Sequence, residues 1–273
     1  DRVMALFTGN IRFTSTDDPQ DNNKGNVYYD ESESQLKHYD GSEWVNVNAN
    51  INYDRPGDGQ YDVDSYTKLL IHSNTSNNST TFTDSGATGH SISRGGAYHT
   101  ESEKKIGDTS MYFDGSNDYI SAPDNADWDF EGTDITIDFW IKFINVSVNS
   151  SIWGQSNGGG NNLKIGNHFS SGNSWWYHMH SPAGSPYNIF FSWSPSNDTW
   201  YHTALVREGD SWKFFVDGQQ TGGTQTQSAA FQDIGGTFRF GQDGEAWRKF
   251  NGYLDEIRVS KGIARWTSNF TVY

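Results

Sequence analysis

The chain has no cysteine among its 273 residues. A disulfide framework and a cysteine-based metal site are therefore both excluded. No apolar run approaches the roughly 18–20 residues that a membrane-spanning helix requires. No stretch repeats its apolar residues with the 3.6-residue period of an amphipathic helix. These absences predict a protein without long helices and without insertion into a membrane.

Positive charge is also scarce. Lys and Arg number 19 against 34 Asp and Glu, which gives a formal net charge of −15. Nucleic acids and anionic membrane surfaces are bound by cationic patches, so we expect neither as a partner. A surplus of carboxylates favours solubility and is also suited to binding divalent cations.

Aromatic residues and glycine are plentiful instead. Phe, Trp and Tyr make up 15% of the chain, and there are 29 glycines. Segments rich in Gly, Asn, Ser and Thr separate short stretches of alternating apolar and polar residues. This pattern is typical of many short strands joined by turns, with aromatic side chains supplying much of the core.

The N-terminal part has a composition of its own. We expect three short strands within residues 25–47, with Tyr39 and Trp44 on either side of a tight turn at residues 40–42. This stretch resembles the small β-module common in tail fibres of bacteriophages; the alternative is a generic β-meander. Residues 52–66 combine Pro-Gly, Asp-Gly and several acids, which indicates a linker. The predicted organisation is a β-module at 1–51, a linker at 52–66 and a large domain at 67–273.

The large domain contains six ordered blocks that resemble one family. They read TKLLIH, MYFDGSNDYI, IDFWIKF, WYHTALVREG, FRFG and FNGYLDEIRVSKGIARWTSNF. Together they are similar to the laminin-G-like branch of the concanavalin A-like lectin/glucanase superfamily. The resemblance implies an all-β fold, an antiparallel two-sheet jelly-roll sandwich, preceded here by the small β-module. It also implies that the curved sheet or the loops at one edge receive a ligand.

The last predicted strand carries acids whose places need an explanation. Alternation puts Asp255 on one face with Ile257 and Val259, and these two mark the core. An inward carboxylate must meet a cation, a metal or several N–H groups. Glu256 and Arg258 are expected to pair at the surface. The tail beyond them, with Ile263, Trp266 and Phe270, is predicted to fold back onto the sandwich.

The resemblance implies a structural calcium ion beside this strand. The candidate ligands are Asp255, Asp84 and Asn74, where Asn74 occupies a position at which relatives more often carry aspartate. Calcium accepts carboxylate and amide oxygens, commonly about 6–8 in all. The alternative is that Asp255 makes a salt bridge or hydrogen bonds.

Tryptophans suggest a carbohydrate site, because sugar rings pack their C–H faces on aromatic rings. In the stretch 175–180 we expect Trp175 and Tyr177 on the core face and Trp176 on the other. For every tryptophan the alternative is packing in the core. The candidate ligand-binding residues are Trp153, Trp176, His178, Trp193 and Trp247.

Catalytic signatures are missing from the sequence. Glucanases of this superfamily use two glutamates close together on one strand, and the nearest stretch here, 131–138, has the wrong spacing. Asp134 and Asp138 are expected to face solvent opposite a stripe of isoleucines. We therefore predict no catalytic residues and no enzyme.

The preferred function is a non-catalytic glycan-binding adhesin of a virion tail or fibre, in the virion or outside cells. Its partner would be a cell-surface carbohydrate, and fibres of this kind are commonly homotrimers, here joined through the N-terminal module. One alternative is a carbohydrate-binding or adhesion module of a bacterial surface or secreted protein. Another is a structural virion domain without a ligand.

Overall fold

The computed structural model describes residues 27–30, 35–39, 44–46, 61, 63–156, 164–170, 174–179, 187–228, 234–242 and 248–272. The chain divides into two compact units, residues 1–52 and 53–273. The first unit has one β-sheet and the second has two.

The first unit contains a three-stranded antiparallel sheet in the order β1-β2-β3. Its strands are β1 (Val27–Asp30), β2 (Gln35–Tyr39) and β3 (Trp44–Asn46). Tyr39 and Trp44 face each other in the register of β2 and β3. The three predicted strands are confirmed, while the predicted turn at 40–42 lies outside the described residues.

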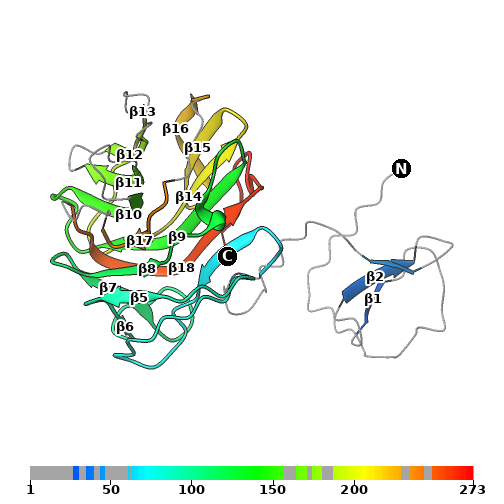
Figure 1. Cartoon of the computed structure of the whole chain (residues 1–273), viewed down its shortest axis with the longest axis horizontal. Coiled ribbons are helices and arrows are strands. Elements are labelled where there is room, and N and C mark those ends of the chain that lie inside the picture. Colours follow the sequence, from blue (N-terminus) through cyan, green and yellow to red (C-terminus); the bar gives the residue numbers. More distant parts are fainter. Residues whose placement is uncertain are drawn as a thin grey trace. The chain divides into compact units, whose positions relative to one another are not determined.

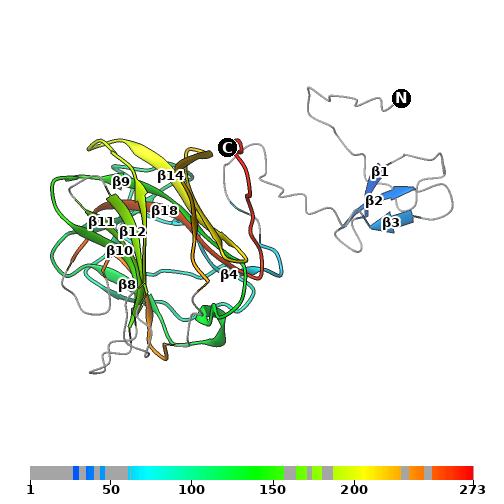
Figure 2. The ribbon, with the colours of Figure 1, turned by 90° about the horizontal axis from the view of Figure 1, so that it is seen from above.

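The second unit is a sandwich of two antiparallel sheets, which face each other in Figures 1 and 2. The seven-stranded sheet has the order β13 (Tyr187–Ser192), β12 (Ser174–Met179), β11 (Lys164–Ser170), β10 (Ser150–Ser156), β17 (Phe238–Phe240), β8 (Tyr119–Ala122) and β5 (Ser93–Gly95). The eight-stranded sheet has the order β16 (Gln219–Thr226), β15 (Ser211–Val216), β14 (Trp200–Glu208), β9 (Ile135–Phe143), β18 (Asn251–Lys261), β7 (Ser110–Asp114) and β6 (Tyr98–Thr100), and β4 (Thr67–Ile71) pairs with β18. Within the described part of the chain, the only helical element is the single 3-10 turn η1 (Ala126–Trp128). The predicted all-β, two-sheet jelly roll is confirmed.

The core between the sheets is largely aromatic. Trp175 on β12 stacks on Phe214 of the opposite sheet, with ring centroids 5.1 Å apart and an angle of 18°. On β9, the predicted apolar stripe faces this core and is fully buried. Aromatic rings bury large apolar areas, so a chain with few leucines can still fill a sandwich of this size.

Strand β18 contains a β-bulge that changes which side chains face the core. The register with β9 shifts between Asp255 and Arg258, and Glu256 has a φ of 47°. Leu254 and Ile257 both lie in the core. An extra residue in a strand reverses the alternation beyond it. The prediction that Asp255 shares the core face with Ile257 is therefore wrong: Asp255 lies on the outer face of the eight-stranded sheet.

Two segments remote in sequence cover this outer face. From the tail, Trp266 and Phe270 stack on each other, 4.0 Å apart, and pack against buried Phe215. This confirms that these two tail residues fold back onto the sandwich. From the other side, Tyr61 is buried and Asp64 pairs with Arg265. The end of the stretch predicted as a linker thus packs on the second unit.

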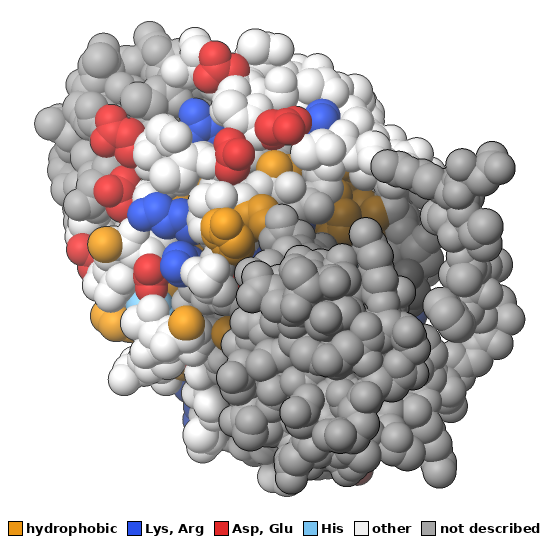
Figure 3. Space-filling model, turned by 90° about the vertical axis from the view of Figure 1, so that its right-hand side faces the viewer, with side chains coloured by type: hydrophobic (Ala, Val, Ile, Leu, Met, Phe, Trp, Pro, Cys, Tyr) orange, Lys and Arg blue, Asp and Glu red, His pale blue; other side chains and the backbone are white. Residues whose placement is uncertain are grey.

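The side of the molecule seen in Figure 3 carries acidic and basic side chains interspersed with hydrophobic ones. Among the described residues, no helix is long and apolar enough to cross a membrane.

Candidate functional site

A buried ion pair lies at the centre of the outer face of the eight-stranded sheet. Arg258 donates from Nε to Asp138 Oδ1 at 3.1 Å and from Nη2 to Oδ2 at 3.0 Å. Burial acts to raise the pKa of Asp138, but Arg258 and the adjacent His202 outweigh it and lower the pKa to about 2. The expected surface pair of Glu256 and Arg258 and the expected solvent-facing Asp138 are both wrong, because other segments cover this face.

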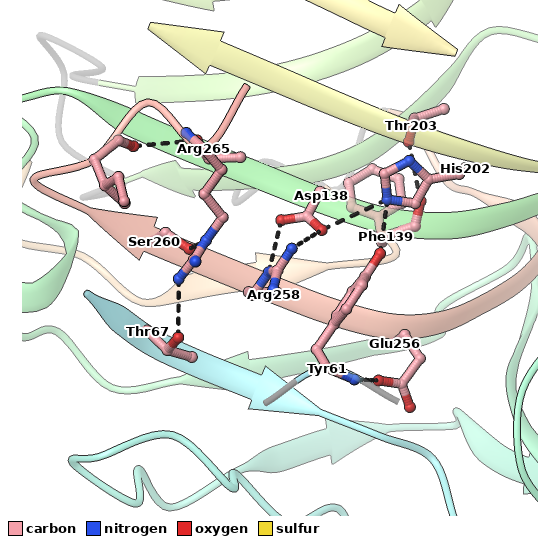
Figure 4. Close-up of polar contacts among 12 residues, drawn as sticks. Tyr61, Thr67, Asp138, Phe139, His202, Thr203, Glu256, Arg258, Ser260 and Arg265 are labelled. Carbon is pink, nitrogen blue, oxygen red and sulfur yellow. Dashed lines mark hydrogen bonds and ion pairs between the residues drawn. The ribbon is translucent and has the colours of Figure 1, made fainter. Parts of the chain in front are cut away.

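Tyr61 closes this ion pair from outside, as Figure 4 shows. Its hydroxyl lies 2.6 Å from His202 Nε2, and the Arg258 guanidinium carbon lies 3.8 Å from the centroid of its ring. Its backbone N–H donates to Glu256 Oε2 at 3.1 Å. Burial and the nearby Asp138 raise the pKa of Tyr61 well above its ordinary value. The members of this cluster are all buried, and Asp138, Arg258, Tyr61 and the Nε2 atom of His202 are held by one another, which suits a structural role.

The predicted calcium ligand Asp255 is fully buried and accepts three backbone hydrogen bonds. Its Oδ2 accepts from the N–H groups of Lys105 and Ile106, both at 3.0 Å, and its Oδ1 accepts from Glu256. Burial raises the pKa of Asp255 well above the ordinary value, although these bonds act to lower it. The alternative of a hydrogen-bonding role accounts for these contacts.

The other two predicted ligands are also engaged by backbone groups. Asp84 accepts from Leu70 and Gly86 through Oδ1 and from His90 through Oδ2, at 2.9, 2.8 and 2.7 Å. Asn74 Oδ1 accepts from the Asp108 N–H at 3.2 Å.

Backbone N–H groups point their positive ends at these oxygens, where calcium would need free lone pairs. Among the residues that the structure describes, no group of three or more His, Cys, Asp or Glu is placed to hold a metal ion. The described contacts do not fit a calcium ion shared by the three residues, and calcium binding stays a prediction.

Two of the predicted sugar-binding tryptophans lie in the core. Trp153 is fully buried and stacks on Phe238 with centroids 5.5 Å apart. Trp193 is 8% exposed and meets Trp175 edge to face at 5.0 Å. Both tryptophans therefore fit the alternative interpretation, which is packing in the core. The side chain of His178 and the whole of Trp247 lie outside what the structure describes.

Trp176 is on the outward face of the seven-stranded sheet, as predicted from alternation. It is half-buried, while Trp175 and Tyr177 on either side of it face the core. The register places it opposite Phe190, whose ring stacks alongside at 5.9 Å and 21°. The Arg248 guanidinium carbon lies 5.1 Å from the centroid of Trp176. We call Trp176, Phe190 and Arg248 the aromatic patch.

Phe190 is 54% exposed, more than any other large hydrophobic side chain in the described part of the chain. An aromatic pair on an outward face, with a guanidinium beside it, offers stacking surface and charged hydrogen-bond donors together. Phe190 and Arg248 were not among the predicted site residues. The alternation within Ile189–Phe191 could have indicated Phe190, but no local signal indicates Arg248.

A polar cleft of about 370 Å³ lies at the end of β4. It brings together Asn74, which the sequence singled out, with residues that it did not. The lining residues are Ile71, His72, Ser73, Asn74, Thr75, Thr81, Thr83, Ser85 and His99. Two runs rich in Ser and Thr, which the sequence pattern predicts as loops, supply most of these residues.

The family follows from a match over more than half of the chain. A family model described as the concanavalin A-like lectin/glucanases superfamily, of the laminin-G type, matches residues 114–265. The chain belongs to this superfamily. The matched range contains Asp138, Trp176 and Phe190 together with most strands of both sheets.

Solved structures share the fold at low sequence identity. The binding domain of Paraclostridial Mosquitocidal Protein 1 has a TM-score of 0.55 and 13% identity, covering 71% of this chain and 48% of that one. The binding domain of botulinum neurotoxin serotype G has a TM-score of 0.54 and 12% identity, covering 75% and 48%. The binding domain of botulinum neurotoxin DC in complex with SialylT has a TM-score of 0.51 and 14% identity, covering 71% and 47%.

The chain thus spans about half the length of these three binding domains. At such identities the likeness establishes the fold alone. No curated protein matches the chain.

Proposed function

We propose that the jelly roll is a non-catalytic glycan-binding module that receives sugar at the aromatic patch. The observation that carries this proposal is the exposed stack of Trp176 and Phe190 on the outward face of a lectin-like sandwich. A sugar ring packs its C–H face on such a surface while nearby polar groups bind its hydroxyls. Asn188, next to the pair on β13, is exposed and supplies an amide.

Arg248 favours a glycan that carries a carboxylate. A guanidinium binds a carboxylate through two parallel hydrogen bonds, which are stronger than neutral ones. Acidic residues outnumber basic ones in this chain, whose net charge is −15, and yet a cationic side chain, Arg248, lies beside the aromatic pair. The botulinum neurotoxin DC binding domain, whose structure is a complex with SialylT, supports a carbohydrate ligand for this fold.

Two buried carboxylates, those of Asp138 and Asp255, support a role without catalysis. A glycosidase needs two carboxyl groups about 5–9.5 Å apart with the substrate between them. Asp138 is held by Arg258, and Asp255 is held by backbone N–H groups inside the protein. Both are fully buried, so neither is offered to a substrate.

We place this module on a virion tail or fibre, in the virion or outside cells, where it recognises host-surface carbohydrate. The observation behind this is the separate three-stranded unit that precedes the jelly roll. A homotrimer through that unit and a bound calcium ion are parts of the same proposal. A module of a bacterial surface or secreted protein, and a virion domain without a ligand, are the competing functions.

A glycan array tests the proposal with variants that truncate exposed aromatic residues. We expect Trp176→Ala and Phe190→Ala each to weaken binding by about tenfold or more, which corresponds to the loss of one stacking contact. Tyr66→Ala is the matched control, because Tyr66 is 38% exposed and lies away from β12 and β13. Arrays in calcium and in chelator test the metal at the same time.

The outcomes separate the alternatives. Silence of the wild-type protein on acidic and neutral glycans, in both calcium and chelator, would leave the ligand-free domain as the better account. Equal binding by Trp176→Ala and Tyr66→Ala would show that a glycan binds elsewhere.

A further inference from the structure

The polar cleft at the end of β4 has the size of a ligand site. Its volume of about 370 Å³ lies within the roughly 300–1,000 Å³ typical of small-molecule pockets. It is formed by β4 and the residues that follow it, by the segment 81–85 and by β6. None of its nine lining residues belongs to the aromatic patch.

The chemistry of the lining favours a neutral ligand. Eight of the nine lining residues that the structure describes are polar, and none of these nine is Lys, Arg, Asp or Glu. A charged ligand would lose its hydration without gaining an opposite charge, which is costly. A ligand with several hydroxyl groups can instead exchange hydrogen bonds to water for hydrogen bonds to the cleft.

Among the described lining residues, His72 is the one that a buried carboxylate orients. Its Nδ1 lies 2.9 Å from Glu256 Oε2 and 3.1 Å from Oε1, and Glu256 is fully buried. When Glu256 is ionised, its carboxylate accepts a hydrogen bond from Nδ1–H, and in the tautomer that this bond selects Nε2 is an acceptor. The N–H of Tyr61 holds the same carboxylate from the other side, at 3.1 Å.

The backbone is strained at the residue that orients His72. Glu256 has a φ of 47° inside the bulge of the longest strand. A non-glycine residue in this region costs on the order of 1 kcal/mol or more, and such strain gathers at ligand sites. The strained position puts the Glu256 carboxylate between His72 and Tyr61.

Several hydroxyl groups of the cleft are available to a ligand. The side chains of Thr75, Thr83 and Ser85 make no hydrogen bond within the described part of the chain. His99 differs, because its Nδ1 bonds the Ser73 hydroxyl at 2.7 Å and its Nε2 bonds the Thr81 carbonyl at 3.0 Å. His99 therefore fixes one wall of the cleft. The three free hydroxyl groups and the His72 ring remain to form hydrogen bonds with a ligand.

We propose that this cleft is a second binding site, specific for a neutral hydroxyl-rich unit such as an uncharged monosaccharide. His72 Nε2 accepts from a ligand hydroxyl, and the hydroxyls of Thr83, Thr75 and Ser85 complete the recognition. The site is independent of the aromatic patch and stands on different residues.

NMR titration of the labelled full chain tests this proposal. The probes are glucose, galactose, mannose and N-acetylglucosamine, with glucuronate as the charged comparison, each up to about 50 mM, which is well above a millimolar Kd. We expect at least one neutral sugar to shift the His72 imidazole signals and the amides of residues 72–75 and 81–85. Glucuronate should leave these signals unchanged.

Matched variants define the site. Thr83→Val removes one free hydroxyl and keeps the shape, and we expect it to weaken binding by about fivefold. Thr226→Val makes the same change on the exposed edge strand β16 and should have no effect. Trp176→Ala should leave the cleft signals unchanged, which separates this site from the aromatic patch.

Three results would overturn the proposal. The first is an absence of shifts at residues 72–75 for all four neutral sugars. The second is binding of glucuronate in the cleft as tight as that of a neutral sugar. The third is equal affinity of Thr83→Val and Thr226→Val.

Discussion

Asp138 and Arg258 show what a single pair of residues does when other segments cover it. Their side chains form a bidentate ion pair with almost no exposure to solvent. Burying such charges costs several kcal/mol, and the pair offsets this only while both partners remain. Removing one partner leaves the other charged and unpaired inside the protein.

The first prediction concerns the acid stability of this pair. The folded-state pKa of Asp138 is about 2, below its ordinary 3.8. Its contribution is therefore fully present above pH 4 and is lost as the pH falls toward 2. The size is about 2 kcal/mol.

Urea unfolding of the wild type and of Asp138→Asn between pH 7 and pH 2 measures this contribution to the free energy of unfolding. The variant should be less stable at pH 7 by about 3–5 kcal/mol, and its deficit should shrink as the pH falls. A constant deficit across the whole range would contradict the assignment. Asp255 is unchanged in both proteins, so its raised pKa, which acts with the opposite sign, cancels in the comparison.

At the scale of elements, the segment around Tyr61 and the tail around Trp266 act as covers for β9, β14 and β18. Without them, the outer face of the eight-stranded sheet would expose Phe215 and the ion pair to water. The segment around Tyr61 is far from all three strands in sequence, and the tail, which directly follows β18, is far from β9 and β14. The second unit therefore consists of two packed sheets and two covering segments, one around Tyr61 and one around Trp266.

The second prediction tests the cover formed by Tyr61. Tyr61→Ala removes a buried ring, its bond to His202 and its contact with Arg258, and should destabilise by about 3–5 kcal/mol. Tyr61→Phe loses only the hydroxyl and should cost about 1 kcal/mol. Tyr66→Ala, at an exposed position, is the control and should change the free energy of unfolding little.

Urea unfolding at pH 7 gives all three values. If Tyr61→Ala behaved like Tyr66→Ala, the segment would not be a structural cover.

At the scale of the whole molecule, the chain comprises two units whose boundary lies near residue 52. The sequence placed the start of the large domain at residue 67, after a linker. Tyr61 and Asp64 precede that point and contact His202 and Arg265 of the jelly roll. A fragment that begins at residue 67 would lack both contacts.

The third prediction compares two fragments by thermal unfolding. Residues 53–273 should fold with the melting temperature of the second unit in the full chain. Residues 67–273 should melt about 6 °C or more lower, since each kcal/mol shifts Tm by about 2–4 °C at this size. Equal melting temperatures of the two fragments would mean that residues 61–66 add no stability.

The sequence by itself determined what depends on local alternation and composition. The stripe from Ile135 to Ile141, the inward Trp175 and the outward Trp176 followed from the two-residue period of a strand. The content of glycine and aromatic residues predicted many short strands, and the resemblance of the ordered motifs to a known family implied the lectin-like sandwich. Three short strands in the first unit were also predictable.

Only the tertiary structure decided what depends on partners far away in the chain. The bulge at Glu256 arises from the register of β18 with its neighbours, and it reversed the face expected for Asp255. β7 and β8, which follow each other closely, lie in different sheets. Asp138 is buried because Tyr61 and the tail lie over it, and His72 in the cleft is held by Glu256, which is 184 residues away in sequence. Burial and pairing across such separations are set by packing, and no local pattern of residues encodes them.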